Sequence, residues 1–239
     1  MYIGLSIVLL WALLYGAYNV YPNAAADIYD LLIIKMTKVW YRAVLTRCRG
    51  GDRMLDIGIG TATALVKNKD LIVSKRLVVV GIDYEDAYIK KAAKVIVDAG
   101  LGELCKVHCK SIYEPALRHV FSGAARFDCA YFSGSLTLMP DPVAALKCAA
   151  AMIVPDGVIY VTQTFQNRPS PIMERIKPLL RRFTSVDFGR VTYYQEVADI
   201  AQKAGMLIVE DGPIPGSIDN ASQTARLIVL KPTSATKSN

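Results

Sequence analysis

The sequence contains little histidine and no closely spaced cysteine pair, and both shortages limit its chemistry. Its 239 residues include 2 histidines and 5 cysteines, without a C-x-x-C motif. A structural zinc site needs about four thiolate or imidazole ligands at short spacings. Only Cys105, His108 and Cys109 lie close together, in a stretch that reads as a strand, where buried thiols are the simpler interpretation. We therefore expect no metal site.

Charged residues are also scarce. They make up 21% of the chain, against 53% for hydrophobic residues, and the net charge is +7. This composition excludes an intrinsically disordered chain, a collagen-like repeat and a small disulfide-stabilised protein. The odd number of cysteines favours a reducing compartment. The mean hydropathy of +0.29 is high for a soluble domain and indicates that part of the chain lies in lipid.

No charged side chain occurs between Met1 and Ala26. At about 1.5 Å per residue, the apolar stretch Ile3–Tyr21 comes close to spanning the hydrocarbon core of a bilayer. A cleaved signal peptide and a buried core helix are the alternatives. The first lacks a basic start and the second lacks a polar face. We therefore expect a single transmembrane helix in residues 1–26.

The charge that follows this segment predicts its orientation. The basic residues that come directly after the apolar stretch are Lys35, Lys38, Arg42, Arg47, Arg49 and Arg53. The positive-inside rule places such a flank on the cytosolic or matrix side of a membrane. We expect the rest of the chain on that side, with the mitochondrial inner membrane favoured over the endoplasmic reticulum.

Short apolar strands then alternate with amphipathic helices. We expect strands at Arg53–Ile57, Arg76–Ile82, Glu103–Lys110, Phe127–Phe132, Gly157–Thr164, Leu207–Asp211 and Ala225–Leu230. This alternation predicts an α/β fold with a doubly wound, mostly parallel sheet. The loop Gly212–Ser222 carries no helix signal, so the last two strands should form an antiparallel hairpin.

The expected organisation is a membrane anchor in 1–26, a linker helix in 27–50, a folded domain in 51–231 and a polar tail in 232–239. Within the domain, Pro171–Phe183 reads as an amphipathic helix with a basic side. This helix either packs on the sheet as a lid or lies on anionic lipid. Nucleic acid is not favoured as a partner, because the sequence has no second basic stripe and no interleaved aromatic residues.

The strongest chemical signal is a strand that runs into a glycine turn. Asp56 ends the strand, and Gly58 and Gly60 follow before a helix begins. Glycines at these positions let the backbone approach a ligand closely. The next strand ends in Asp83, where a carboxylate can accept the hydroxyl protons of a ribose. The alternative interpretations are that Asp56 caps a helix and that Asp83 is a solvated strand end.

Two other nucleotide sites fit this pattern badly. A phosphate-binding P-loop needs Gly-Lys-Ser/Thr after the turn, and that motif does not follow here. A nicotinamide-binding loop needs a third glycine, where Thr63 stands. The acid at Asp56 would repel a pyrophosphate but attract an ammonium group on the ligand.

These residues make the sequence similar to the class I S-adenosylmethionine-dependent methyltransferases, from roughly Tyr41 to Lys231. The run Asp56–Ala62 resembles the family's D-x-G-x-G-x-G/A loop, and Asp83 resembles its ribose-binding acid. The segment Phe127–Phe132 resembles its fourth strand. The resemblance implies a Rossmann-like seven-stranded sheet with an antiparallel last strand, and S-adenosyl-L-methionine as cofactor.

The resemblance also implies a set of cofactor-binding residues. They are Asp56, Gly58, Gly60, Thr61, Asp83, Tyr84, Ser111, Ile112 and Ser133. Two departures from the family pattern occur. Ser111 and Ile112 stand where many members have an Asp or Asn that binds adenine, and Ser133 opens a segment that replaces the Asn/Asp-Pro-Pro-Tyr motif. The catalytic base stays unidentified.

The implied function is methyl transfer to a hydrophobic or membrane-associated acceptor, such as a small molecule or a lipid. This is the small-molecule and lipid branch of the family, with an added membrane anchor. The alternative is a methyltransferase-like accessory subunit without catalysis, in a membrane complex such as a mitochondrial inner-membrane assembly. Its partners would then be other protein subunits.

Overall fold

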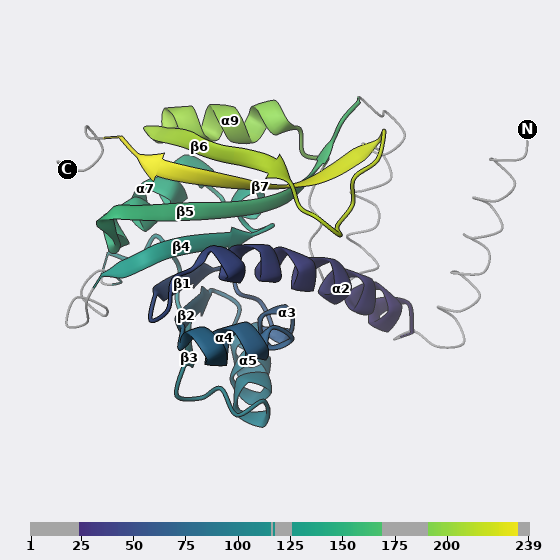
Figure 1. Ribbon diagram of the computed structural model, residues 1–239, viewed down its shortest axis with the longest axis vertical. Coiled ribbons are helices and arrows are strands. Elements are labelled where there is room, and N and C mark those ends of the chain that lie inside the picture. Colours follow the sequence, from purple (N-terminus) through teal and green to yellow (C-terminus); the bar gives the residue numbers. More distant parts are fainter. Residues whose placement is uncertain (1–23, 116, 118–125, 169–190, 234–239) are drawn as a thin grey trace, which may run out of the picture. The chain divides into compact units, whose positions relative to one another are not determined.

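The computed structural model describes residues 24–115, 117, 126–168 and 191–233, and Figure 1 shows its elements. The predicted anchor up to Asn23 and the predicted basic helix Pro171–Phe183 lie outside these residues. In the part that is described, no helix has the length and apolar character needed to cross a membrane. The sheet and its core belong to one compact unit, Met36–Pro169 with Thr192–Asn239, and the description below concerns this unit.

Seven strands form one mixed sheet in the order β3-β2-β1-β4-β5-β7-β6. The first five are parallel, and β7 runs antiparallel to both of its neighbours. The strands are β1 Arg53–Ile57, β2 Val78–Asp83, β3 Cys105–Cys109, β4 Phe127–Ser133, β5 Ile153–Gln166, β6 Met206–Pro213 and β7 Gln223–Pro232. The predicted sheet with its reversed last strand is therefore confirmed.

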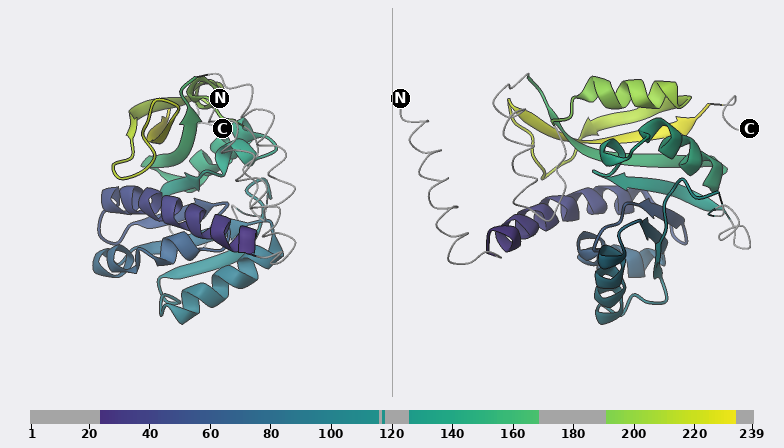
Figure 2. Two further views of the ribbon diagram at one scale, coloured as in Figure 1. Left: turned by 90° about the vertical axis from the view of Figure 1, so that its right-hand side faces the viewer. Right: turned by 180° about the vertical axis from the view of Figure 1, so that it is seen from behind.

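Helices cover both faces of this sheet, as Figures 1 and 2 show. One face packs against α2, α3, α4 and α5, and the other packs against η1, α7 and α9. Their bounds are α2 Ala24–Arg47, α3 Thr63–Val66, α4 Lys69–Lys75, α5 Asp86–Asp98, η1 Leu136–Leu138, α7 Pro142–Met152 and α9 Tyr194–Lys203. The central strands are buried on both faces, which explains their continuous apolar sequences.

The sequence predicts one helix after the glycine turn, whereas the structure has two, α3 and α4. The chain breaks at the fully buried Asn68, which precedes α4. Its side-chain amide donates to the carbonyl oxygens of Ala64 (3.0 Å) and Lys38 (3.1 Å). Asn68 therefore ties the end of α3 to α2.

From Met36 onward, helix α2 is part of the core. Its buried side chains are Trp40, Tyr41, Val44 and Leu45. The ammonium group of Lys75 in α4 donates to the carbonyl oxygens of Leu45, Thr46 and Cys48 at 2.7–3.0 Å. These bonds satisfy carbonyl groups that a helix end leaves without partners. The second half of α2 is thus fixed on the sheet close to β1 and β4.

Candidate active site

The strand order creates a crevice between β1 and β4. From β1 the chain continues through β2 to β3 at one edge, and then returns to β4 on the other side of β1. Helices leave the two strands on opposite faces, so the loops at their carboxyl ends separate. Ligands of open α/β sheets bind at this type of switch point. The loop 58–62 after β1 and the loop 134–135 after β4 lie there.

The loop after β1 depends on its glycines. Gly58 has a φ of +75°, and its N–H donates to the carbonyl oxygen of Ile82 at 2.8 Å. A Cβ atom on Gly58 would lie 2.6 Å from the Cβ of Ser135. Gly60 has a φ of +59°, but a Cβ there would meet no heavy atom of the described residues within 4 Å. A side chain at position 58 would therefore disturb the packing of this loop against Ser135. A side chain at position 60 would enter open space.

A third glycine, Gly81 in β2, also shapes this loop. A Cβ on Gly81 would overlap the Cδ1 atom of Ile59, which packs flat against the strand. Ile59 is buried, and its N–H also donates to the carbonyl oxygen of Ile82. The signal in the sequence was a glycine inside a strand otherwise made of branched apolar residues.

Asp83 holds the glycine loop from the end of β2. Its Oδ2 accepts the N–H of Gly60 at 3.0 Å, and its Oδ1 accepts the N–H of Glu85 at 3.0 Å. The residue is 8% exposed, so it is not a solvated strand end. Burial raises the pKa of its carboxyl, and these backbone hydrogen bonds oppose the shift. Next to it, the side chain of Tyr84 is 79% exposed, which is unusual for a large aromatic residue.

Asp56 is fully buried and does not cap a helix. The residue before α3 is Ala62, in a left-handed conformation and without a side-chain cap. The Oδ2 atom of Asp56 accepts the hydroxyl proton of Tyr41 at 2.7 Å, and its Oδ1 atom has no hydrogen-bond partner among the described residues. Burial, reinforced by the charge of Asp83, raises the pKa of Asp56 to about 7, against the lowering effect of the Tyr41 bond.

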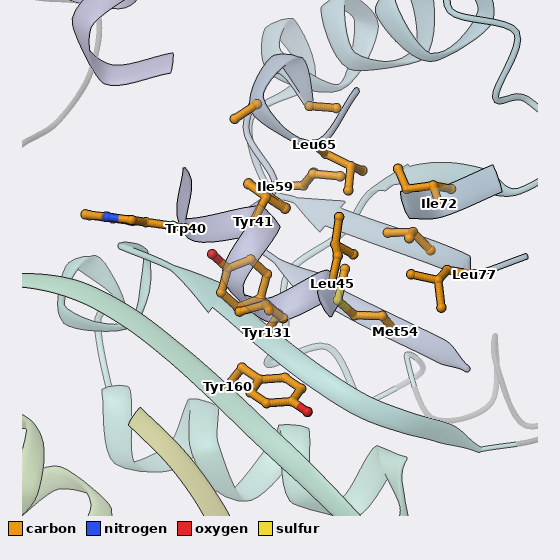
Figure 3. Close-up of a cluster of buried hydrophobic side chains, with 14 of the residues drawn as sticks. Trp40, Tyr41, Leu45, Met54, Ile59, Leu65, Ile72, Leu77, Tyr131 and Tyr160 are labelled. Atoms are coloured by element: carbon orange, nitrogen blue, oxygen red, sulfur yellow. The ribbon is translucent and has the colours of Figure 1, made fainter. Parts of the chain in front are cut away.

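Tyrosines connect this carboxylate to the sheet. Figure 3 shows Tyr41 from α2, Tyr131 from β4 and Tyr160 from β5 within one buried cluster. The rings of Tyr41 and Tyr131 meet edge to face, with centroids 5.0 Å apart. The hydroxyl group of Tyr131 is hydrogen-bonded to that of Thr162 at 2.8 Å. The side chain of Tyr41 is thus fixed on both sides.

The loop after β4 carries two serines with different roles. The hydroxyl group of Ser135 donates to the carbonyl oxygen of Ile57 at 2.5 Å and joins this loop to the end of β1. The hydroxyl group of Ser133 is buried close to the hydroxyl groups of Tyr41 and Tyr131, whose pKa values it lowers, but it makes no well-aligned hydrogen bond to a described residue. Trp40 covers Gly134, whose Cβ position lies 3.4 Å from the indole ring. The indole N–H of Trp40 donates to Ser217 at 3.0 Å.

The predicted residues after β3 lie in a separate turn. Ser111 accepts the N–H of Tyr113 at 3.3 Å, and its own N–H donates to the carboxylate of Glu114 at 2.8 Å. Ile112 is buried against the apolar core. A cavity of about 360 Å³ opens beside this turn, lined by Ile112, Tyr113, Glu114, Pro115, Leu117, Cys148 and Met152.

Three of the five cysteines, Cys48, Cys105 and Cys129, are buried as free thiols. Cys105 is buried, and burial raises the pKa of its thiol to about 12. The sulfur atoms of Cys48 and Cys129 lie 4.0 Å apart as free thiols in the core. Across the described residues, no three His, Cys, Asp or Glu side chains gather as a metal site requires.

The sequence matches a protein-family model described as "Methyltransferase domain" over residues 49–212, which is more than half of the chain. The chain belongs to this methyltransferase family. A search of curated proteins finds no match. The methyltransferase fold is also found in solved structures, at low sequence identity.

One similar structure is the [4+2]-cyclase SpnF, with a TM-score of 0.62, 16% identity and 82% of each chain covered. Another is the mitomycin 7-O-methyltransferase MmcR, with a TM-score of 0.64, 16% identity, and 92% of this chain and 60% of MmcR covered. A third is the O-methyltransferase NcsB1 from neocarzinostatin biosynthesis, solved with S-adenosylmethionine, with a TM-score of 0.61, 17% identity, and 92% and 61% covered. The chain spans about 60% of the length of these two O-methyltransferases.

In this methyltransferase domain, the predicted site residues form two groups. Around the glycine loop, hydrogen bonds link Gly60 to Asp83, and Asp56 lies at the end of the same strand. Thr61 continues the loop, and its hydroxyl is bonded to that of Thr63 at 2.9 Å. The turn that contains Ser111 and Ile112 belongs to the end of β3. The contribution of Tyr41 was not predicted, because its helix was interpreted as a linker outside the domain.

Proposed function

We propose that this domain transfers a methyl group from S-adenosylmethionine to an oxygen atom of a small, hydrophobic acceptor. The observation that carries the proposal is the arrangement around Gly60. Asp83 lies on one side of this glycine, and the buried Asp56 lies at the start of the same loop. Open space at the Gly60 Cβ position gives a cofactor room to contact the backbone.

The residues of the crevice fit the parts of this cofactor. Asp83 already accepts two backbone N–H groups, but each carboxylate oxygen keeps lone pairs for the ribose hydroxyl protons. Asp56 has an oxygen without a partner in the described part of the chain, and an ammonium group would satisfy it. The exposed ring of Tyr84 follows Asp83 and offers a face for an adenine base.

S-adenosylmethionine, when bound, supplies a methyl group that is already activated by the sulfonium. The residues of the chain therefore need only to bind, align the acceptor and exclude water. The buried ring of Trp40 packs over Gly134 and makes the end of β4 apolar. The buried hydroxyl of Ser133 lies at the same end and offers a polar contact. This combination favours an acceptor that is mainly apolar with one polar group.

The binding half of the proposal is tested with Asp83→Ala. Each charge-assisted hydrogen bond to a ribose hydroxyl contributes about 1.5–3 kcal/mol. We expect the variant to bind S-adenosylmethionine roughly ten- to several-hundred-fold more weakly in calorimetry. Asp98→Ala is the matched control, because Asp98 is an exposed carboxylate on α5 that pairs only with Lys94 among the described residues. Equal affinity in wild type and Asp83→Ala would remove Asp83 from the site.

The transfer half is tested with isotope-labelled methyl groups. The purified chain is incubated with labelled S-adenosylmethionine and a panel of hydroxylated aromatic and lipid acceptors, and the products are identified by mass spectrometry. Label on an acceptor oxygen, strongly reduced with Asp83→Ala at a limiting concentration of S-adenosylmethionine, is the expected result. Label on nitrogen or carbon acceptors alone would contradict oxygen transfer while leaving the methyl donor in place.

We also propose that residues 1–26 anchor the domain to a membrane, with the domain on the cytosolic or matrix side. The absence of charge up to Ala26 and the basic residues after it support this proposal. Deleting residues 1–22 should move the protein into the soluble fraction. Leu13→Arg should weaken membrane retention, and Leu13→Ile should not. If the protein without residues 1–22 still resisted carbonate extraction, another surface of the protein would bind the membrane.

A further inference from the structure

We propose that Tyr41 is a positioning residue for the cofactor. Its hydroxyl occupies Oδ2 of Asp56 and so presents the other oxygen, Oδ1, to the ammonium group of S-adenosylmethionine. This inference rests on the proposed function, and it adds a residue that lies before the matched family region of residues 49–212.

The geometry of Tyr41 and Asp56 restricts how their side chains can be oriented. Tyr41 is 3% exposed and Asp56 is fully buried, and the O···O distance of 2.7 Å is that of a strong hydrogen bond. A tyrosine hydroxyl has a single proton, and here it is donated to Oδ2. The edge-to-face contact with Tyr131 prevents the ring from turning away. Rotation of the carboxylate is therefore restricted, and Oδ1 keeps its direction.

The described surroundings of Asp56 supply no cation for its ionised form. The groups that face it are Tyr41 on α2, Asp83 on β2, Tyr131 on β4 and, further away, Cys105 on β3. These groups are neutral or negative, and within the described residues none that shifts the pKa of Asp56 is a cation. A buried carboxylate without a cationic partner is unfavourable. The ammonium group of a bound ligand supplies the missing charge.

This arrangement makes cofactor binding dependent on pH. Only ionised Asp56 attracts an ammonium group, and burial raises its pKa to about 7, so affinity falls about tenfold for each pH unit below that value. The hydrogen bond from Tyr41 lowers the pKa of Asp56 and keeps the carboxylate ionised. The ammonium group itself loses its proton near pH 8, and this upper limit does not involve Tyr41.

The test is Tyr41→Phe, which removes one hydroxyl and keeps the ring. Calorimetry with S-adenosylmethionine between pH 5.5 and 8.5 should show the lower midpoint of the affinity profile about one pH unit higher, with roughly fivefold weaker binding at pH 7. Carbon-13 NMR of the Asp56 carboxyl should show the same shift without cofactor. Tyr160→Phe is the control, because Tyr160 belongs to the same cluster and is not bonded to Asp56.

A second substitution keeps the test sharp if Tyr41→Phe folds poorly. Incorporating 3-fluorotyrosine at position 41 makes the hydroxyl a stronger donor, so the midpoint should move to lower pH. Midpoints that stay unchanged in both variants, while wild type binds S-adenosylmethionine, would overturn this inference alone. A wild-type chain that does not bind S-adenosylmethionine would overturn the proposed function and, with it, the ligand assigned to Oδ1.

Discussion

Replacing Asp56 with asparagine should stabilise the fold and weaken cofactor binding in the same protein. The pKa of Asp56 is about 7 in the folded chain and about 4 in an unfolded one. As the pH rises between these values, the unfolded chain ionises first, so the folded state loses stability. The loss amounts to roughly 4 kcal/mol at pH 7 and above. Asparagine has nearly the same shape, stays neutral and avoids this loss.

Urea unfolding at pH 5 and pH 8 measures the first effect. Asp56→Asn should exceed wild type in unfolding free energy most clearly at pH 8, and calorimetry should show about ten- to a hundred-fold weaker S-adenosylmethionine binding. Asp98→Asn, on the surface of α5, should change neither quantity. If Asp56→Asn destabilised the protein at pH 8, the carboxylate would have a role in folding that its burial does not indicate.

Gly58→Ala should cost both stability and activity. The alanine would have to adopt a backbone φ of +75°, and its Cβ atom would lie 2.6 Å from the Cβ of Ser135. Backbone strain of this kind costs about 1–3 kcal/mol, and the displaced loop would move away from Asp83. We expect an unfolding free energy lower by about 3 kcal/mol and a rate of methyl transfer lower by about a hundredfold, since small misplacements reduce rates strongly.

Gly60→Ala distinguishes the effect of a glycine on stability from its effect on cofactor binding. Its Cβ would meet no described atom within 4 Å, so only the strain at a φ of +59° remains. This variant should be more stable than Gly58→Ala in the same unfolding experiment. It should still bind S-adenosylmethionine weakly, because the methyl group enters the space assigned to the cofactor. If both substitutions lowered the unfolding free energy equally, Ser135 would be able to move away from position 58 at little energetic cost.

The strands were predictable because their signals are local. The expected strand Arg53–Ile57 coincides with β1, and the expected strand Phe127–Phe132 differs from β4 by one residue. A short apolar run bounded by turn residues is visible among neighbours in the sequence, and the strand ends follow from it. For the same reason, Asp56 and Asp83 could be placed at strand ends from the sequence.

The contacts that complete the crevice could not be predicted in this way. Tyr41 and Asp56 are 15 residues apart, and Ser135 and Ile57 are 78 apart. No periodic pattern encodes such pairs, because they depend on how α2 and β4 pack against β1. The sequence of the helix that carries Tyr41 indicates a linker, because its basic residues mask the apolar side that enters the core. Sequence reasoning also selected Ser133, whereas Ser135 makes the bond between the loops.

The position of β7 has a consequence for synthesis on the ribosome. This strand is the last of the sheet in sequence, yet it lies between β5 and β6, which were made earlier and pair through it. Until Gln223–Pro232 has emerged, β5 presents an open edge and β6 has no strand to join. The nascent chain therefore exposes an unpaired strand edge late in translation, at the stage when such edges are most prone to aggregate. A chaperone that shields the edge of β5 would act in this interval.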